Sequence, residues 1–419
     1  MPIEFIGSLV NGSAANFRPG GYDSDYPARM ARLHEAAGFD RLLVGHSSSA
    51  PDGFTVADTV LTATSTLKVL LAHRPGFVAP TVAARQYATL DAFHPGRVAM
   101  HIISGGDDAD QARDGDFSDK AARYRRSDEF LDIVKREWAQ TTPFDYEGEF
   151  YQVKGARSDV RPGSGKLPVY FAGASADAVR VGGRQADVYA FWGEPLAAIA
   201  TRIAQVRASA EQAGRTIDRF SVSTRPIAAA TEEAAWERAH RILDAELAKG
   251  APGATFTARG SLGSQRLADL ADQSEIHDKR LWTPLAKTPT AGGNATALVG
   301  SYEQIAEALL DYVAIGVTTL LIRGYDPEAD AADYATIIDL VRQQDPTLAR
   351  SSSVKHAFVQ ENQGHHSERT RGSVSQRPAP AHSALGPEQH PRHQPAVDGR
   401  QRRPQPTAQP PVVVQEGRQ

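Results

Sequence analysis

The chain has 419 residues, of which 41% are hydrophobic, which is enough for one large core, and (β/α)8 barrels of about 250 residues or more are common. Its 46 Lys and Arg against 50 Asp and Glu give a net charge of −4, which excludes a global field favouring nucleic acid or an anionic membrane. The absence of cysteine excludes disulfides, thiolate metal ligands and a cysteine nucleophile. With no signal-peptide pattern and no apolar run near the roughly 18 residues of a spanning helix, we expect a cytoplasmic protein.

Short apolar runs recur along the first 350 residues. They are rich in Val, Ile and Leu and mostly apolar on both faces, as strands of a helix-covered parallel sheet are. The predicted strands are Ile3–Leu9, Arg41–Val44, Lys68–Ala72, Ala99–Ile103, Val169–Ala172, Val188–Ala190, Arg219–Thr224 and Thr319–Ile322.

Helix-length amphipathic segments separate these strands. The predicted helices are Pro27–Ala37, Val82–Phe93, Arg123–Gln140, Leu196–Ala213, Glu232–Leu247 and Tyr302–Ile315. Strand-then-helix alternation indicates an α/β fold, and eight units favour a closed TIM (β/α)8 barrel. An open, doubly wound sheet is the alternative.

Two long stretches interrupt the alternation, Gly105–Arg123 and Lys249–Asn294. Long insertions after barrel strands often form lids at the catalytic mouth, so we expect the second to be a lid; ordinary surface excursions are the alternative. After residue 350 the chain is rich in Pro, Gln, His and Arg, with few aliphatic residues and no period. We therefore predict a barrel domain over residues 1–350 and a disordered tail over 351–419.

Barrel chemistry takes place at the carboxyl ends of the strands. After the fifth strand, Gly173-Ala174-Ser175 leads into a helix, and its free N–H groups suit a phosphate; the alternative is an ordinary turn with Ser175 as N-cap. Trp192 ends the sixth strand and suits either a planar ring or the core. Arg225, just beyond the seventh strand, suits an anionic substrate group or an internal salt bridge.

Metal-binding and nucleotide motifs are missing. There is no HxH, HExxH, Walker A or GxGxxG pattern, so we expect no metal site. His73 and His101 end different strands and are expected to form hydrogen bonds in a pocket rather than to bind a metal.

The run Arg74–Asp91, RPGFVAPTVAARQYATLD, resembles a segment of the two-component alkanesulfonate monooxygenases. Further matches follow in the same order over roughly residues 2–345: Gly96-Arg97, Asp114–Phe117, Arg123-Tyr124, Pro168–Phe171, Trp192–Pro195, Gly292-Gly293, Thr296–Gly300 and Gly324-Tyr325. The chain thus resembles the luciferase-like flavin monooxygenases, and the alkanesulfonate branch in particular.

The resemblance implies a TIM barrel with a mobile insertion, which binds reduced FMN from a separate NAD(P)H-dependent flavin reductase. It implies that O2 and the flavin oxidise a small organosulfur substrate, giving an aldehyde and sulfite from an alkanesulfonate. It also implies a homo-oligomer, a dimer or a tetramer. The alternatives are a deazaflavin-dependent enzyme that transfers hydride and a flavin-binding protein without catalysis.

The same resemblance implies roles for nine residues. Those that would line the flavin are Asp52, His101, Ser104 and Tyr124; those at its phosphate are Ala174 and Ser175; those facing the substrate and the reactive edge of the flavin are Trp192, Arg225 and Tyr325.

Four departures from the family pattern bear on the substrate. Ala50 replaces a Cys, and Ala291 replaces the Arg of the lid. The family's Arg and His at the end of the seventh strand become Ser223 and Arg225, and a His near the first strand becomes Asn11 or Gly12. These changes predict a subfamily with a different sulfonate, a sulfone or another small oxidisable substrate.

Overall fold

Eight parallel strands pair side by side until the last meets the first. The closing contacts are Ile6 beside Leu321 and Trp192 beside Ser223. The strands, in ring order, are β1 (Glu4–Leu9), β4 (Arg41–Val44), β5 (Lys68–His73), β6 (Val98–Ile102), β9 (Val169–Ala172), β10 (Val188–Trp192), β11 (Phe220–Ala229) and β15 (Thr319–Ile322). All eight predicted strands and the TIM barrel are confirmed.

The computed structural model describes residues 2–9, 17–18, 21–249, 261–288, 291, 294–326 and 328–344. These all belong to one compact unit, Met1–Val359. The predicted tail, 351–419, lies outside the described residues. Within the described residues, no helix combines the length and the apolar character needed to cross a membrane.

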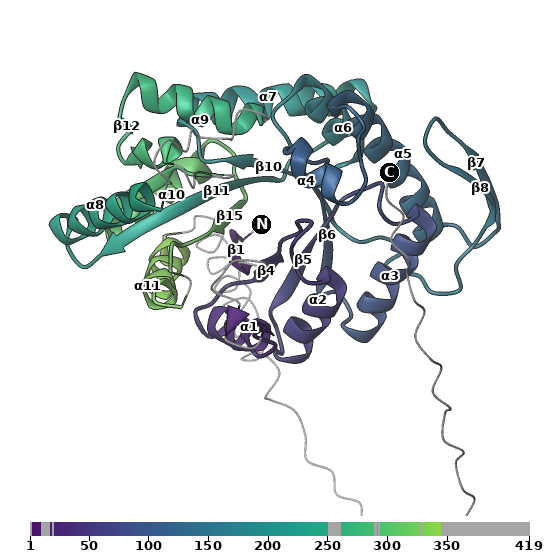
Figure 1. Ribbon diagram of the computed structural model, residues 1–419, viewed down its shortest axis with the longest axis horizontal. Coiled ribbons are helices and arrows are strands. Elements are labelled where there is room, and N and C mark those ends of the chain that lie inside the picture. Colours follow the sequence, from purple (N-terminus) through teal and green to yellow (C-terminus); the bar gives the residue numbers. More distant parts are fainter. Residues whose placement is uncertain are drawn as a thin grey trace, which may run out of the picture. The chain divides into compact units, whose positions relative to one another are not determined.

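Helices surround the strand ring (Figure 1). One follows each strand: α1 (Tyr26–Ala36), α2 (Gly53–Thr62), α3 (Pro80–Phe93), α5 (Lys120–Ala139), α6 (Ala176–Gln185), α7 (Leu196–Gln212), α10 (Tyr302–Ala314) and α11 (Asp330–Gln343). The sequence analysis named neither α2 nor α11. Thr and Val weaken the helix propensity of α2, but burial of Val56, Ala57, Val60 and Leu61 on one face stabilises it.

Several insertions interrupt the alternation of barrel strands and helices. The loop after β6 contains α4 (Asp108–Arg113), and a hairpin of β7 (Phe144–Glu147) and β8 (Gln152–Ala156) stands beside α5 (Figure 1). Short strands β2 (Phe17–Arg18) and β3 (Gly21–Tyr22) pair after β1.

The largest insertion lies between β11 and α10. It contains α8 (Glu232–Ala248), α9 (Leu262–Gln273), β12 (Ile276–His277), β13 (Leu281–Trp282), the 3-10 helix η3 (Pro284–Lys287) and β14 (Ala297–Ser301). The second half of β11 leaves the ring and pairs with β14, with Arg225 beside Ala297 and Ala229 beside Ser301. Because of this pairing, β11 belongs both to the barrel and to a small side sheet.

The barrel interior is sealed in its middle by apolar side chains. Alternate residues of each strand point inward, and those that meet here are Ile6, Leu43, Leu70, Ala99, Tyr170, Val188 and Leu321. Solvent and ligands can therefore reach the interior only from the two ends of the barrel.

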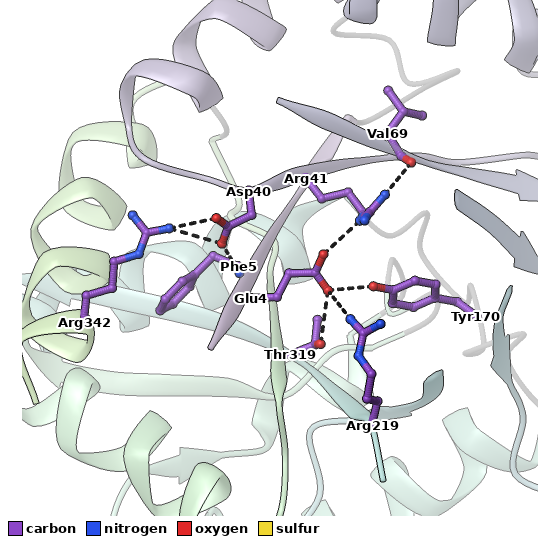
Figure 2. A network of polar contacts seen from close by, with 9 residues as sticks. All are labelled: Glu4, Phe5, Asp40, Arg41, Val69, Tyr170, Arg219, Thr319 and Arg342. Atoms are coloured by element: carbon purple, nitrogen blue, oxygen red, sulfur yellow. Dashed lines mark hydrogen bonds and ion pairs between the residues drawn. The ribbon is translucent and has the colours of Figure 1, made fainter. Parts of the chain in front are cut away.

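At the amino ends of the strands, a group that we call the barrel-floor cluster surrounds Glu4 (Figure 2). Its carboxylate accepts hydrogen bonds from Arg41 (3.1 Å), the Tyr170 hydroxyl (2.6 Å), Arg219 (3.2 Å) and the Thr319 hydroxyl (3.3 Å). Burial alone would raise the pKa of Glu4, but Arg41, Tyr170 and Arg219 hold it below its usual value of 4.5. The cluster ties five strands or strand entries together through one ionised carboxylate.

Candidate functional site

A cleft opens at the carboxyl ends of β6, β9 and β10, under α9. It holds a cavity of about 160 Å3, which continues into an open mouth. Small residues at the strand ends leave this space: Ala172, Gly173, Ala174 and Ala190. Any side chain on Gly173 would collide, since its Cβ would lie 2.3 Å from the Cβ of Ala178 and 2.8 Å from the Tyr124 hydroxyl oxygen.

One wall of the cleft contains three of the residues implied for the flavin, Ser104, Tyr124 and Ala174. The Ser104 hydroxyl lies 2.9 Å from that of Ser127, which fixes it at the end of β6. Tyr124 extends from α5 toward Ser175; burial raises the pKa of its phenol, while the contact with the Ser175 hydroxyl opposes the rise. Ser175 is the N-cap of α6, and its hydroxyl accepts from the Ala178 N–H at 3.2 Å. The structure thus brings Tyr124, Ala174 and Ser175 together at the start of α6.

Cationic side chains that the sequence analysis did not single out lie beside this wall: Lys120 of α5, Arg202 of α7 and Arg266 of α9. Arg202 and Arg266 both pair with Glu194, at 3.3 Å each, and Arg266 also donates to the Ala174 carbonyl at 3.3 Å. Burial raises the pKa of Glu194, opposed by Arg266. The three cations come from helices that are distant in sequence, so their proximity cannot be recognised without the fold.

Lys120 differs from the two arginines. Burial lowers its pKa, as does the charge of Arg123, and it forms no ion pair with a carboxylate among the described residues. Its ammonium group lines the cleft near the start of α6, where the charge of an anion would be stabilised.

Trp192 lines the cleft beside α9. The indole packs against Gly263, where a Cβ would lie only 2.4 Å from Cζ3 of the ring. Trp192 also contacts an apolar cluster of the insertion, formed by Leu267, Ala286, Ala291 and Ala295. Ala291, which replaces the lid Arg of the family, is therefore part of this packing and is 8% exposed.

Arg225 and Tyr325 lie on the neighbouring strand ends, β11 and β15. The guanidinium carbon of Arg225 is 5.0 Å from the centroid of the Tyr325 ring, a cation–π distance. Nε of Arg225 is buried and has no hydrogen-bond partner among the described residues, and the buried Tyr325 hydroxyl contacts the Arg225 guanidinium. Burial raises the pKa of Tyr325, opposed by the charge of Arg225.

The other three residues implied for the flavin and its phosphate, Ser175, Asp52 and His101, are not part of the cleft lining. Asp52 is the N-cap of α2, where it accepts from the backbone and side chain of Thr55 at 2.8 Å each. His101 points into the barrel one inward position before Ile103, which lines the cleft. Its Nδ1 is buried and has no hydrogen-bond partner in the part of the chain that the structure describes, and burial lowers the pKa of the imidazole to about 4, so the ring is neutral at neutral pH.

Of the remaining departures from the family pattern, Ser223 lies in the described part of the chain and contacts the insertion. The Ser223 carbonyl accepts from the Asn294 side chain at 2.7 Å, which ties β11 to the insertion. Asn11, Gly12 and the matching pair Gly292-Gly293 lie outside the described residues. Within the described part, no group of three His, Asp or Glu side chains could hold a metal ion.

Solved structures with the same fold come from several enzymes. Riboflavin lyase (RcaE) is 18% identical, with a TM-score of 0.67 over 82% of this chain and 92% of that one. EDTA monooxygenase (EmoA) from Chelativorans sp. BNC1 is 16% identical, with a TM-score of 0.67 over 82% and 94%. An F420-dependent secondary alcohol dehydrogenase is 14% identical, with a TM-score of 0.61 over 81% and 99%.

At these identities the solved structures establish the fold alone. The family model for the luciferase-like monooxygenases matches residues 4–319, which is most of the barrel and includes the cleft. The chain therefore belongs to the luciferase-like monooxygenase family.

Proposed function

We propose that the protein is a two-component, FMN-dependent monooxygenase that oxidises a small anionic organosulfur substrate, an alkanesulfonate giving aldehyde and sulfite. The observation that carries the proposal is the pairing of two sites at one barrel mouth. The start of α6, capped by Ser175, follows β9 at the cleft, and an arginine with no carboxylate partner among the described residues lies on β11. A flavin with a phosphate and a charged substrate need these two features together.

The residues of the cleft fit FMN. The start of α6, with Ser175, Tyr124 and Lys120 around it, suits the phosphate. The small residues at the ends of β9 and β10 leave room for a flat ring system. The buried Nδ1 of His101 on β6, which has no partner among the described residues, is a polar group available to such a ring. The structure of riboflavin lyase, a neighbour in fold, was solved with a modified FMN, which supports this assignment.

Reduced FMN, supplied by a separate NAD(P)H-dependent flavin reductase, would provide the chemistry that activates O2. The protein's own residues do the rest. Ser175 and Tyr124 hold the phosphate, and Trp192 with α9 covers the cleft and excludes water. Arg225 binds the anionic group of the substrate and stabilises negative charge that develops beside it. We propose a homo-oligomer, a dimer or tetramer, as the working form.

A deazaflavin enzyme is the competing candidate, because the F420-dependent alcohol dehydrogenase has the same fold. The test supplies the purified protein with either reduced FMN and O2 or reduced deazaflavin, and measures sulfite release over a panel of sulfonates and product formation from alcohols. Sulfite release that requires reduced FMN supports the proposal. Turnover with the deazaflavin only, or flavin binding without any turnover, would reject it.

A further inference from the structure

A second arginine, Arg323, lies beside Arg225. The two residues directly follow the registered pair Thr224 and Ile322 on the parallel strands β11 and β15. The Arg323 N–H donates to the Thr224 carbonyl at 3.1 Å, so the backbones are fixed side by side at this point.

Both side chains point toward the barrel mouth. On β15, Thr319 meets Glu4 inside the barrel and Leu321 belongs to the interior apolar layer, so the strand period places Arg323 on the same inward face. On β11, Phe220 and Val222 pack in the outer core, which leaves Ser221, Ser223 and Arg225 facing inward. Burial, together with the charge of Arg225, lowers the pKa of Arg323 to about 10.

No carboxylate among the described residues forms an ion pair with either arginine. Two acidic side chains lie near Tyr325, and both have other cations: Glu246 pairs with Lys249 at 2.6 Å, and Asp330 pairs with Arg238. The undescribed stretches before residue 345 contain no Asp or Glu. The carboxylates that the structure does not describe therefore all lie from residue 345 onward.

Two half-buried like charges without a counter-ion destabilise the protein in the absence of an anion. A bound group with a single charge can neutralise only one of them. We propose that Arg225 and Arg323 form a subsite for a dianion, so that the substrate is a short organosulfonate that also has a carboxylate. This inference rests on the proposed function and narrows its substrate class.

The chemistry remains that of a sulfonate monooxygenase. For sulfoacetate, the C–S bond breaks and a C=O bond forms, which gives glyoxylate and sulfite. One atom of O2 enters the aldehyde and the other leaves as water, while reduced FMN supplies two electrons.

The test compares ethanesulfonate with sulfoacetate, which have two carbons each and differ by one negative charge. Isothermal titration calorimetry on the full chain with oxidised FMN measures both affinities at fixed ionic strength. We expect sulfoacetate to bind at least about tenfold more tightly, as one added charge-assisted hydrogen-bond pair provides. Arg323→Gln should remove this preference and leave ethanesulfonate affinity within about threefold.

Arg207→Gln is the matched control, because Arg207 also stacks on an aromatic ring, Phe220 at 5.2 Å, but outside the barrel interior. If Arg323→Gln does not fold, Arg323→Lys replaces it and should retain part of the preference. Equal affinity of the parent for both ligands, or an unchanged preference in Arg323→Gln, would overturn the inference.

The calorimetry separates this inference from the proposed function. If no sulfonate releases sulfite with reduced FMN and O2, the proposed function fails, while the affinities still decide whether the pair selects dianions. If ethanesulfonate and sulfoacetate are oxidised with equal kcat/KM and bind equally well, the proposed function holds and the dianion subsite is wrong.

Discussion

The guanidinium of Arg225 lies over the ring of Tyr325, with Cζ 5.0 Å from the ring centroid, and its buried Nε has no partner among the described residues. The aromatic ring holds the cation at the barrel mouth without neutralising it. This arrangement keeps the charge available for a ligand, which an internal salt bridge would not.

Replacing Arg225 by Ala should therefore lower kcat/KM by at least about a hundredfold, because a charged group that stabilises substrate and developing charge is lost. Arg225→Lys should recover only part of the rate, since Lys lacks the planar fork. FMN affinity should change little, because the phosphate pocket lies on β9. Arg207→Ala, outside the site, is the control. A well-folded Arg225→Ala protein with an unchanged single-turnover rate would contradict the assignment.

Ser175 has two roles that can be separated. Its hydroxyl caps α6, so Ser175→Ala should destabilise the fold by about 1 kcal/mol. Loss of a hydrogen bond to the FMN phosphate should also weaken FMN binding by roughly tenfold or more. Ser175→Thr keeps the hydroxyl and should retain both. FMN affinity from fluorescence quenching and Tm from calorimetry measure the two effects; FMN affinity unchanged in Ser175→Ala would place the phosphate elsewhere.

Gly263 allows α9 to approach Trp192. A Cβ at Gly263 would lie 2.4 Å from the indole, so Gly263→Ala should push α9 away from the cleft, although Ala raises the helix propensity of α9 itself. We expect kcat/KM to fall by roughly tenfold to a hundredfold with Tm almost unchanged. More hydrogen peroxide should be released per reduced FMN consumed, because water enters the cleft.

The control for this variant is Gly106→Ala, whose Cβ would meet Ser261 at an ordinary 3.7 Å. If Gly263→Ala and Gly106→Ala couple reduced FMN to product equally well, α9 does not act as the cover.

Glu4→Gln should disrupt the barrel-floor cluster. It leaves Arg41, which is 6% exposed, without its charge partner, and breaking such a pair costs about 3 kcal/mol of unfolding free energy. Glu149→Gln is the control, because its pair with Arg125 is half exposed and should contribute less than about 1 kcal/mol. FMN affinity per folded molecule should be unchanged in both.

The cluster also predicts a pH dependence. Because the pKa of Glu4 in the folded protein lies below 4.5, its contribution to stability is complete above pH 4.5 and is lost as pH falls through the lowered value. The free energy of unfolding of the parent, measured with urea, should decrease as the pH falls over that acidic range. The decrease should be smaller for Glu4→Gln. Parallel pH profiles of the two proteins would show that Glu4 does not titrate differently in the folded state.

Removal of the tail after Arg350 should leave Tm and FMN affinity nearly unchanged, since its composition cannot form a core. Size-exclusion chromatography with light scattering should give the same oligomeric state for both forms. A large fall in Tm, or dissociation of the shortened chain, would show that the tail packs on the barrel or completes an oligomer.

The barrel strands could be predicted from the sequence because a strand buried on both faces appears as an apolar run, and most of the eight are such runs; β11, with Ser221, Ser223 and Thr224, is more mixed. The cleft cations could not, because Lys120, Arg202 and Arg266 occupy ordinary polar positions on three helices. Arg323 was visible at a strand end, but its pairing with Arg225 depends on the register of β11 and β15. Asp52 shows the converse: a polar residue after a strand can simply cap the next helix.

The shared strand β11 restricts how this enzyme can be recombined with its relatives. Ile227 of β11 belongs to the core of the side sheet with Trp282 and Ala297, so this core includes a residue of the barrel strand. A chimaera that exchanges the whole insertion must therefore join before Arg225 and after Ser301. Such a graft would import the donor's residue at position 225, so specificity and lid would be inherited as one module.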